Sequence, residues 1–429
     1  MQFLKSYPSI WLLLAVFIEV GFQTWWNKQW GDYLSPTVMF LAGVMTCWVA
    51  YRMVAFKTEP IPLAKTAESV KRKSIVILTL FLLGTIWIGM EYATIQAKFP
   101  VKEDGTGSDV IPSLLLYVKR FLAGAYPYQP LEFDGWTVMP TYFPMMWMPY
   151  SFSEILNIDY RWTAYLVFLI PLFFLQWPMR KQDISILEIG FKVLLPFGFI
   201  YLYMYHFDHI MGYGVELMPV GLYFLLVLSL RAKHPILIAI PIVFVLLSRY
   251  AFTFWLPVYI LTIWMERGFK EVFKVSVCVF VGVLLLYVIP FLSKDWDIFF
   301  EGLAYYGKTA ETAWQWERGD GRPLILITGL SHAIYFYDFV EGELLERLRV
   351  NRIFHITMCL LTALGIFYIY WKKRNRGLNV ALYLLIALKL YLVVFYSFFY
   401  VPFRYLFQLP MFLTIPILYH IALFRKQMD

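Results

Sequence analysis

Asp109 is the carboxylate whose neighbours in the sequence best suit acid–base chemistry. It follows Gly105, Gly107 and Ser108, and it precedes a segment whose apolar residues recur at helical spacing: Val110, Ile111, Leu114, Leu115, Val118 and Leu122. The glycines permit a close backbone approach, and the first turn of the expected amphipathic helix would fix the direction of the carboxylate. Such a group can take a proton from a hydroxyl. The simpler interpretation is an N-cap, and the two roles are compatible.

Three arginines stand at the expected outer ends of apolar segments: Arg161 in DYRW, Arg249 in SRY and Arg404 in PFRY. An arginine can bind phosphate through two parallel hydrogen bonds, and a charge at membrane depth is costly enough to indicate a function. The alternative is an interfacial anchor whose charge reaches the headgroups. Arg249 is the strongest candidate because it interrupts an apolar run. Lys192 and Lys389 are expected to reach the interface from near helix ends.

The sequence HFDHIMGYGVE places His206, Asp208, His209 and Glu216 near one turn. These side chains could ligate a divalent cation such as Mg²⁺ or Mn²⁺, although no four-ligand zinc pattern is present, and a polar turn that lines a cavity is the favoured interpretation. No cofactor is therefore assigned. The chain has no glycine-rich phosphate loop, GxSxG elbow or HExxH motif, so nucleotide, serine and zinc hydrolysis have no support.

The composition predicts a polytopic membrane protein, with 60% hydrophobic and 15% charged residues. Several apolar segments have the length of about 20 residues that a bilayer core requires. They cover 9–26, 34–54, 74–96, 162–179, 184–205, 215–231, 275–293, 353–371, 379–399 and 405–424, with two shorter segments between Pro235 and Met265. Loops on the side of the two termini hold 20 Lys and Arg against 6 Asp and Glu, and the opposite loops hold 15 against 20. This asymmetry favours about twelve spans with both ends cytoplasmic, and it argues against nucleic acid as the partner of the +8 charge.

Two large loops fall on the outer side in this topology. The first covers residues 97–161 and the second covers 294–352, and each carries short amphipathic segments. The apolar segment from Leu324 to Val340 is expected to be a re-entrant or surface helix, because a thirteenth span would place the basic cluster from Lys372 to Arg376 outside. Irregular backbone at membrane depth needs protein or a water-filled cavity around it. The fold class expected is therefore an all-α transmembrane bundle whose outer loops share a cavity.

The first outer loop resembles that of the GT-C superfamily of integral-membrane glycosyltransferases. The likeness lies in GSD before an amphipathic helix, then RFLAGAYPYQP, then PTYFPMMWMPY leading into a span, and it is clearest at Asp109, Gly124, Pro127, Tyr128, Tyr142 and Pro144. The branch it resembles most comprises polyprenyl-phosphate-mannose-dependent, mannosyltransferase-like proteins. Residues 1–73 look like two spans and a linker added before a GT-C-like domain of residues 74–429.

The resemblance implies transfer of a sugar from a polyprenyl-phosphate donor to a lipid-linked or cell-envelope glycan acceptor. Asp109 would be the general base, Arg249, Arg404 and Arg161 would bind the donor phosphate, and the cavity would be lined by Tyr126, Tyr128, Tyr142, His206, Asp208, His209 and Glu216. The site would face the periplasm or cell exterior from a bacterial inner membrane. Membrane lipids, the donor and the acceptor would be its partners. The DxD pair common among glycosyltransferases is absent at Asp109, which leaves metal use open.

Two other functions fit the same composition. A transporter or flippase of lipid-linked sugars would use intramembrane carboxylates such as Glu19, Glu91 or Glu188, but it would be expected to show paired internal repeats, and none is evident. A polysaccharide ligase or polymerase also has large outer loops and lipid-phosphate substrates. That function would be favoured if Arg318, Arg322 and His332 in the second outer region were essential while Asp109 was not.

Overall fold

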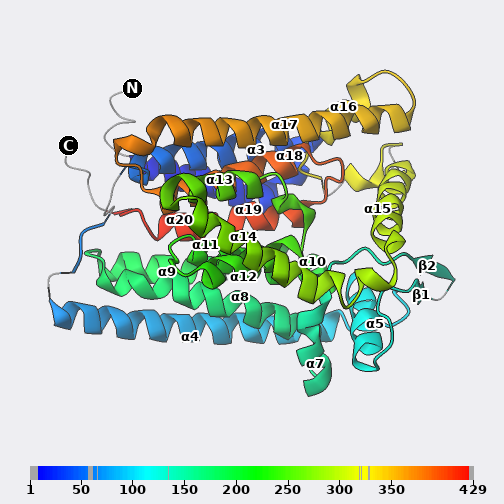
Figure 1. Ribbon diagram of the computed structural model, residues 1–429, viewed down its shortest axis with the longest axis horizontal. Helices are drawn as coiled ribbons and strands as arrows, with labels where there is room; N and C mark the ends of the chain where they lie inside the picture. Colours follow the sequence, from blue (N-terminus) through cyan, green and yellow to red (C-terminus); the bar gives the residue numbers. More distant parts are fainter. Residues whose placement is uncertain are drawn as a thin grey trace.

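The computed structural model describes residues 8–56, 61–64, 66–133, 135–317, 319, 321–326 and 329–424. Within them, eight helices are long and apolar enough to cross a membrane. They are α2 (Pro8–Gly21) continued by η1 (Phe22–Trp26), α3 (Asn27–Val54), α4 (Ala67–Lys98), α8 (Tyr160–Gln176) continued by η3 (Trp177–Lys181), α9 (Ile186–His206), α14 (Phe269–Val283) continued by η5 (Leu284–Val288), α17 (Leu344–Lys373) continued by η8 (Arg374–Arg376), and α18 (Val380–Phe398). Most of them follow the long axis of the molecule (Figure 1). The expected helical, multi-span character of the chain is therefore present.

The remaining predicted spans form shorter helices. They are α11 (Leu217–Ser229), α12 (Pro235–Leu246), α13 (Leu256–Arg267) and the broken run of η9 (Arg404–Phe407), α19 (Gln408–Phe412) and α20 (Thr414–Leu418). At 1.5 Å per residue, the 12 residues of α12 extend about 18 Å, which is less than the roughly 30 Å hydrocarbon core. The described helices thus establish eight candidate spans by length, and the predicted count of twelve depends on these shorter elements.

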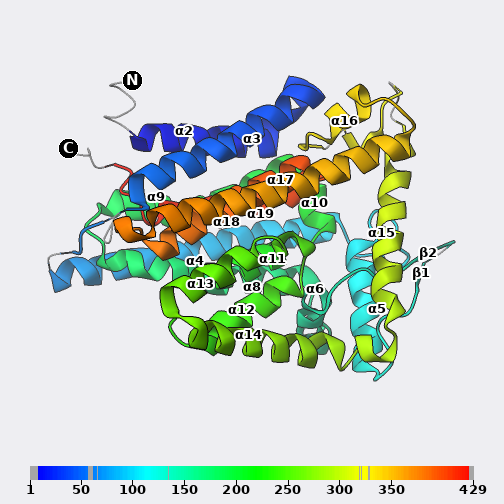
Figure 2. The same cartoon turned by 45° about the horizontal axis from the view of Figure 1, so that its top comes forward.

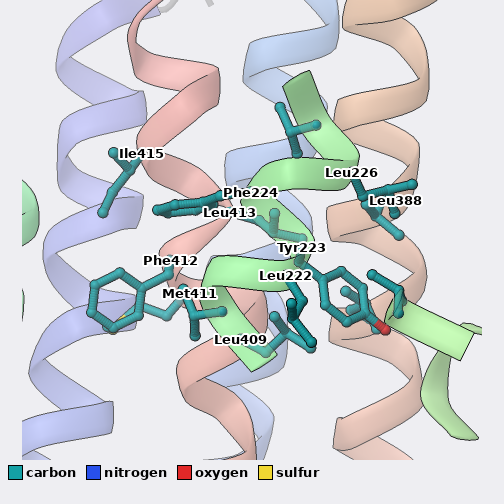
Figure 3. Packing of buried hydrophobic residues seen from close by; sticks show 14 of the residues in the cluster. Leu222, Tyr223, Phe224, Leu226, Leu388, Leu409, Met411, Phe412, Leu413 and Ile415 are labelled. Carbon is teal, nitrogen blue, oxygen red and sulfur yellow. The ribbon is translucent and has the colours of Figure 1, made fainter. Parts of the chain in front are cut away.

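The core of the bundle is apolar and lies around α11, α18 and α19. Leu222 and Phe224 of α11 pack with Leu388 of α18 and Met411 of α19 (Figure 3). Helix α18 is the most enclosed of the long helices, with 83% of its apolar window buried. Helix α11 lies directly on α8, because a Cβ added to Gly221 would stand 2.3 Å from the carbonyl oxygen of Val167. This close packing fixes the positions of α8 and α11 relative to each other.

The two predicted outer regions lie at one end of the molecule, and the described chain ends lie toward the other (Figures 1 and 2). The first contains α5 (Val110–Leu122), the hairpin of β1 (Leu131–Phe133) and β2 (Trp136–Val138), α6 (Pro144–Trp147), η2 (Met148–Tyr150) and α7 (Ser151–Leu156). The strands are antiparallel, with Glu132 opposite Thr137. The second contains η6 (Leu292–Lys294), α15 (Asp297–Gln315), η7 (Leu324–Leu326) and α16 (Ala333–Phe339). Both α5 and α15 run across the end of the bundle (Figure 2).

The expected single helix from Leu324 to Val340 is wrong for the described residues, which hold only the turn η7 and the short helix α16. The backbone between them bonds to the end of α18 and to the chain after it. The Leu330 N–H donates to the Pro402 carbonyl at 3.1 Å, and the His332 N–H donates to the Ser397 carbonyl at 2.7 Å. These bonds take the donors that a continuous helix would have used.

The prediction that Lys192 and Lys389 reach the membrane interface is also wrong. Lys389 lies midway along α18 and is fully buried, and its Nζ donates to Glu19 Oε1 at 2.6 Å and to the Pro410 carbonyl at 2.9 Å. Lys192 is equally buried and pairs with Glu188 one turn earlier in α9. Each ammonium is thus compensated by a carboxylate inside the bundle, which removes the need to reach water.

Candidate functional site

A cavity of about 400 Å³ lies where the outer regions meet the ends of the bundle helices. Its wall combines the segment before α5, the loop before α6, α10 (Asp208–Tyr213), the break between α12 and α13, α15, the end of α18 and η9. The two outer regions are closely packed over it. A Cβ on Gly302 of α15 would stand 2.6 Å from the Pro140 carbonyl oxygen, and the Tyr305 hydroxyl donates to the Thr137 carbonyl at 3.2 Å. The expected shared cavity is therefore present at this end.

Arg249 and Glu216 form an ion pair in the cavity wall. Arg249 leaves the helical path between α12 and α13 with extended dihedral angles, and Glu216 precedes the first residue of α11. Nη2 of Arg249 donates to both carboxylate oxygens of Glu216, at 2.7 Å each. The Tyr396 hydroxyl of α18 also interacts with the Arg249 guanidinium. Both side chains are mostly buried, with 17% and 11% exposure, which strengthens their attraction.

Asp109 lies beside the cavity, between the wall residues Ser108 and Val110. It precedes α5 as predicted, but its carboxylate makes no capping hydrogen bond. Ser108 performs that role instead, because its Oγ accepts from the Val110 N–H at 3.3 Å. Burial raises the pKa of the Asp109 carboxyl above its usual range, and the residue's own backbone N–H partly opposes the rise. Asp109 therefore occupies the N-cap position, but it does not cap the helix through its carboxylate, which remains available for chemistry.

Tyr142 connects the two charged parts of the site. Burial raises the pKa of its hydroxyl, the negative charge of Asp109 raises it further, and Arg249 acts in the opposite direction. The ring therefore lies within electrostatic range of both groups. Its backbone is held from both sides, because the Tyr142 N–H donates to the Tyr117 hydroxyl at 3.4 Å and its carbonyl accepts from Tyr128 at 3.1 Å. Tyr128 is thus a buried support for the wall and does not line the main cavity.

The loop between α5 and β1 is held by Arg120. Its Nη1 donates to the Gln129 carbonyl at 2.7 Å and its Nη2 donates to the Pro130 carbonyl at 2.8 Å. The prolines of RFLAGAYPYQP supply no N–H for local turn bonds, and the Arg120 guanidinium donates to carbonyls of this loop. The positive φ of +93° at Gly107 brings the chain before Asp109 against the ring of Tyr213, as the close approach predicted for these glycines requires.

Three residues proposed for the site are placed outside the main cavity. Tyr126 donates to the Phe291 carbonyl at 3.2 Å, near η6. Arg161 is 1% exposed and binds Asp159 at 2.6 Å together with the carbonyls of Phe99 and Gly212. Arg404 is equally buried, with its guanidinium 3.3 Å from the centre of the Phe207 ring. Arg161 is engaged in contacts between segments, and Arg404 packs on Phe207, so neither lies in the cavity wall, and their role at a donor phosphate stays a prediction.

The residues of HFDHIMGYGVE separate in the structure. His209 and Glu216 line the cavity. His206 stacks on Trp25, with ring centroids 5.3 Å apart, and Asp208 pairs with Lys98 of α4. Within the part of the chain that is described, no three His, Cys, Asp or Glu side chains gather in a way that could hold a metal ion. The four residues therefore do not form one ligand set.

Two of the residues that would favour a ligase, Arg322 and His332, lie apart from the cavity. Arg322 pairs with Asp32 at 3.2 Å and with Asp338 at 2.5 Å, which joins α3 to α16. His332 faces the Ser397 carbonyl, with 2.9 Å between this oxygen and its Nδ1. Arg318 lies outside the described residues.

Sequence reasoning missed a group of tyrosines in the wall. Tyr306 of α15, Tyr396 of α18 and Tyr405 of η9 line the cavity from three elements. Tyr405 immediately follows Arg404 in PFRY, and the tyrosine of this motif, not the arginine, lines the cavity. A wall this rich in aromatic hydroxyls suits ligands with both apolar and polar faces.

Protein-family models, curated protein sequences and solved structures were compared with the chain, and none of them matches it. The function must therefore be argued from the site itself.

Proposed function

We propose that the protein is a membrane glycosyltransferase that moves a sugar from a polyprenyl-phosphate donor to a hydroxyl of a glycan or glycolipid acceptor. The observation that carries this proposal is the presence, around one tyrosine-lined cavity, of a carboxylate that makes no capping hydrogen bond and a mostly buried arginine. Asp109 supplies the carboxylate and Arg249 supplies the guanidinium. The likeness of the first outer loop to GT-C enzymes points to the same chemistry.

In this reaction Asp109 acts as the general base. Its carboxylate takes the proton of the acceptor hydroxyl as that oxygen attacks the anomeric carbon. The bond between the anomeric carbon and the phosphate oxygen breaks, and its electron pair stays on the departing phosphate. The raised pKa of Asp109 makes its carboxylate a better proton acceptor than that of an ordinary aspartate.

Arg249 has two roles in the proposed reaction. Its guanidinium binds the donor phosphate in the ground state, and it stabilises the negative charge that the leaving group gains as the bond breaks. The tyrosines of the wall would hold the sugar ring and the first units of the prenyl chain. His209 lies on the α10 side of the wall, where it would contact the sugar.

The position of the cavity at the ends of the long helices suits a lipid-linked donor. The cavity lies at the end of helices that are long enough to cross a membrane, so a phosphate at Arg249 would lie near the headgroups while its prenyl chain remained in the acyl region. We place the protein in a bacterial inner membrane, with this end facing the periplasm or cell exterior. The loop charges favour that orientation.

The test is sugar transfer in membranes that carry the wild type or Arg249→Lys, supplied with a panel of radiolabelled polyprenyl-phosphate sugars. Lysine keeps the charge but cannot form two parallel bonds. Transfer by the wild type from one donor, with a clear loss in Arg249→Lys, would support the proposal. Equal transfer by both proteins would remove the phosphate role of Arg249, and no transfer from any donor would contradict the function.

A transporter of lipid-linked sugars is the second candidate, and the buried Glu19–Lys389 pair is the observation that favours it. Intramembrane charges commonly mark transport paths. Against this, both members are satisfied by one another and by the Pro410 carbonyl, which is the arrangement of a structural pair. Movement of labelled lipid-linked sugar across vesicles without any transfer would favour the transporter.

A further inference from the structure

In and beside the cavity, acidic side chains outnumber basic ones. Glu216 and Arg249 compensate one another, and Asp109 lies beside them without a cationic partner among the described residues. A phosphate would bring at least one further negative charge. Like charges at short range in a partly buried site are unfavourable, so the site must change its charge when a phosphate enters.

The geometry of the pair restricts how a phosphate can reach Arg249. A guanidinium presents two edges for bidentate binding, one made by Nε and Nη2 and the other by Nη1 and Nη2. Nη2 belongs to both edges, and both Glu216 oxygens lie 2.7 Å from it. While Glu216 stays in place, neither edge is open. A phosphate that binds Arg249 with two parallel bonds must displace Glu216.

A displaced Glu216 would remain in a poor environment for a charge. Burial raises the pKa of the Glu216 carboxyl, and Arg249 is the cation that opposes this rise. The other ionisable groups that act electrostatically with Glu216 come from the loop before α6, η2, α9, α18 and η9, and they are Tyr142, Tyr150, Tyr203, Tyr396 and Tyr405. A neutral tyrosine cannot replace the guanidinium. The ionised form of Glu216 therefore loses its stabilisation when Arg249 turns to a phosphate.

We propose that Glu216 occupies Arg249 in the empty site, and that an entering phosphate takes its place while Glu216 takes up a proton. This inference rests on the proposed function. The proton comes from the aqueous medium and converts the carboxylate to a carboxylic acid, while the guanidinium stays protonated and no covalent bond to phosphate forms. The exchange keeps the charge of the cavity nearly constant. It also makes phosphate binding weaker as the pH rises, because the proton becomes scarcer.

The experiment is calorimetric titration of farnesyl phosphate into the purified full-length protein, in two buffers of different ionisation enthalpy at the same pH. Farnesyl phosphate carries the phosphate and a short prenyl chain of the proposed leaving group, and a chelator keeps divalent cations from supplying charge. The dependence of the heat on the buffer gives the number of protons taken up. We expect about one proton per ligand for the wild type at mildly alkaline pH.

Glu216→Gln should bind farnesyl phosphate without that proton, and at alkaline pH it should bind at least about tenfold more tightly than the wild type. Glu216→Asp keeps an ionisable group and should retain the proton uptake. It is the variant to use if Glu216→Gln is unstable. Glu271→Gln is the matched control, because Glu271 pairs with Lys274 in α14 outside the cavity wall. It should behave as the wild type does.

The outcomes separate this inference from the proposed function. If the wild type bound farnesyl phosphate without proton uptake, and Arg249→Lys did not bind it, the exchange would be overturned. The proposed glycosyltransferase function would be unaffected. Uptake that persists in Glu216→Gln would assign the proton to the phosphate or to Asp109, and it would also overturn the exchange. An absence of binding by the wild type would overturn both proposals.

Discussion

Nη2 of Arg249 donates to both carboxylate oxygens of Glu216, at 2.7 Å each, in the wall of the cavity between the two outer regions. The two residues lie 33 positions apart, one at the start of α11 and one in the break between α12 and α13. The pair therefore has two consequences. It joins two short helices at the outer end, and it occupies the guanidinium that a phosphate would need to bind.

The first consequence predicts a stability effect. Arg249→Gln leaves the Glu216 charge without its partner, and we expect a loss of about 3 kcal/mol in the free energy of unfolding, as for other mostly buried pairs. The double variant Arg249→Gln/Glu216→Gln removes both charges and should recover most of this loss without recovering donor binding. Unfolding by sodium dodecyl sulfate in mixed micelles measures the first quantity. A double variant as unstable as the single variant would contradict this account.

A second stability prediction concerns Glu19 and Lys389, which are buried at the middle of the bundle. Lys389→Met leaves Glu19 uncompensated and should lower the free energy of unfolding by about 3 kcal/mol or more. Lys389→Met paired with Glu19→Gln should recover stability, and it should also retain sugar transfer. If the stable double variant had lost transfer or substrate movement, the pair would have a functional role that favours the transporter.

The close packing of α11 on α8 gives a third prediction. A Cβ at Gly221 would stand 2.3 Å from the Val167 carbonyl oxygen, so Gly221→Ala should force the helices apart and cost about 1–3 kcal/mol. Gly198→Ala is the control, because no atom lies within 4 Å of the added carbon there. It should be neutral or slightly stabilising, since alanine favours a helix. Thermal unfolding of both variants checks the difference, and equal losses would contradict the close approach.

The raised pKa of Asp109 predicts the pH dependence of transfer. The base must be ionised, so kcat/KM should fall as the pH drops through the pKa of Asp109, at a pH above the ordinary aspartate value of about 3.9. The same shift means that the contribution of this group to stability is greatest at low pH and is lost as the pH rises through the folded-state pKa. A rate profile that stays flat down to the ordinary value would contradict the assignment.

The sequence was most informative where short-range patterns decide the structure. The apolar spacing after Asp109 predicts the helix that forms as Val110–Leu122, and the glycines before it predict the close approach seen at Gly107. The break at Arg249 within an apolar run also marks a cavity residue correctly. In each case the signal and its structural result lie within a few residues of each other.

Contacts between distant residues were not predictable in the same way. Lys389 resembles an interface lysine until its partner is known, and Glu19 lies 370 positions away. Arg161 is different, because its main partner Asp159 stands two positions earlier in DYRW and could have been noticed. The hydropathy pattern likewise located the helical segments but could not decide which of the shorter ones cross a membrane, because that depends on packing in the core.

Glycosyl transfer by Asp109→Asn is the measurement that tests the central claim most directly. The change keeps the size of the side chain and removes the base, and Asp104→Asn is the control, because Asp104 is an exposed loop residue that accepts from the Thr106 N–H at 2.8 Å. With the donor that the wild type uses, we expect transfer to fall by at least about a hundredfold in Asp109→Asn while donor binding is retained and the control stays active. Wild-type transfer by Asp109→Asn would contradict the account and leave this carboxylate without a catalytic role.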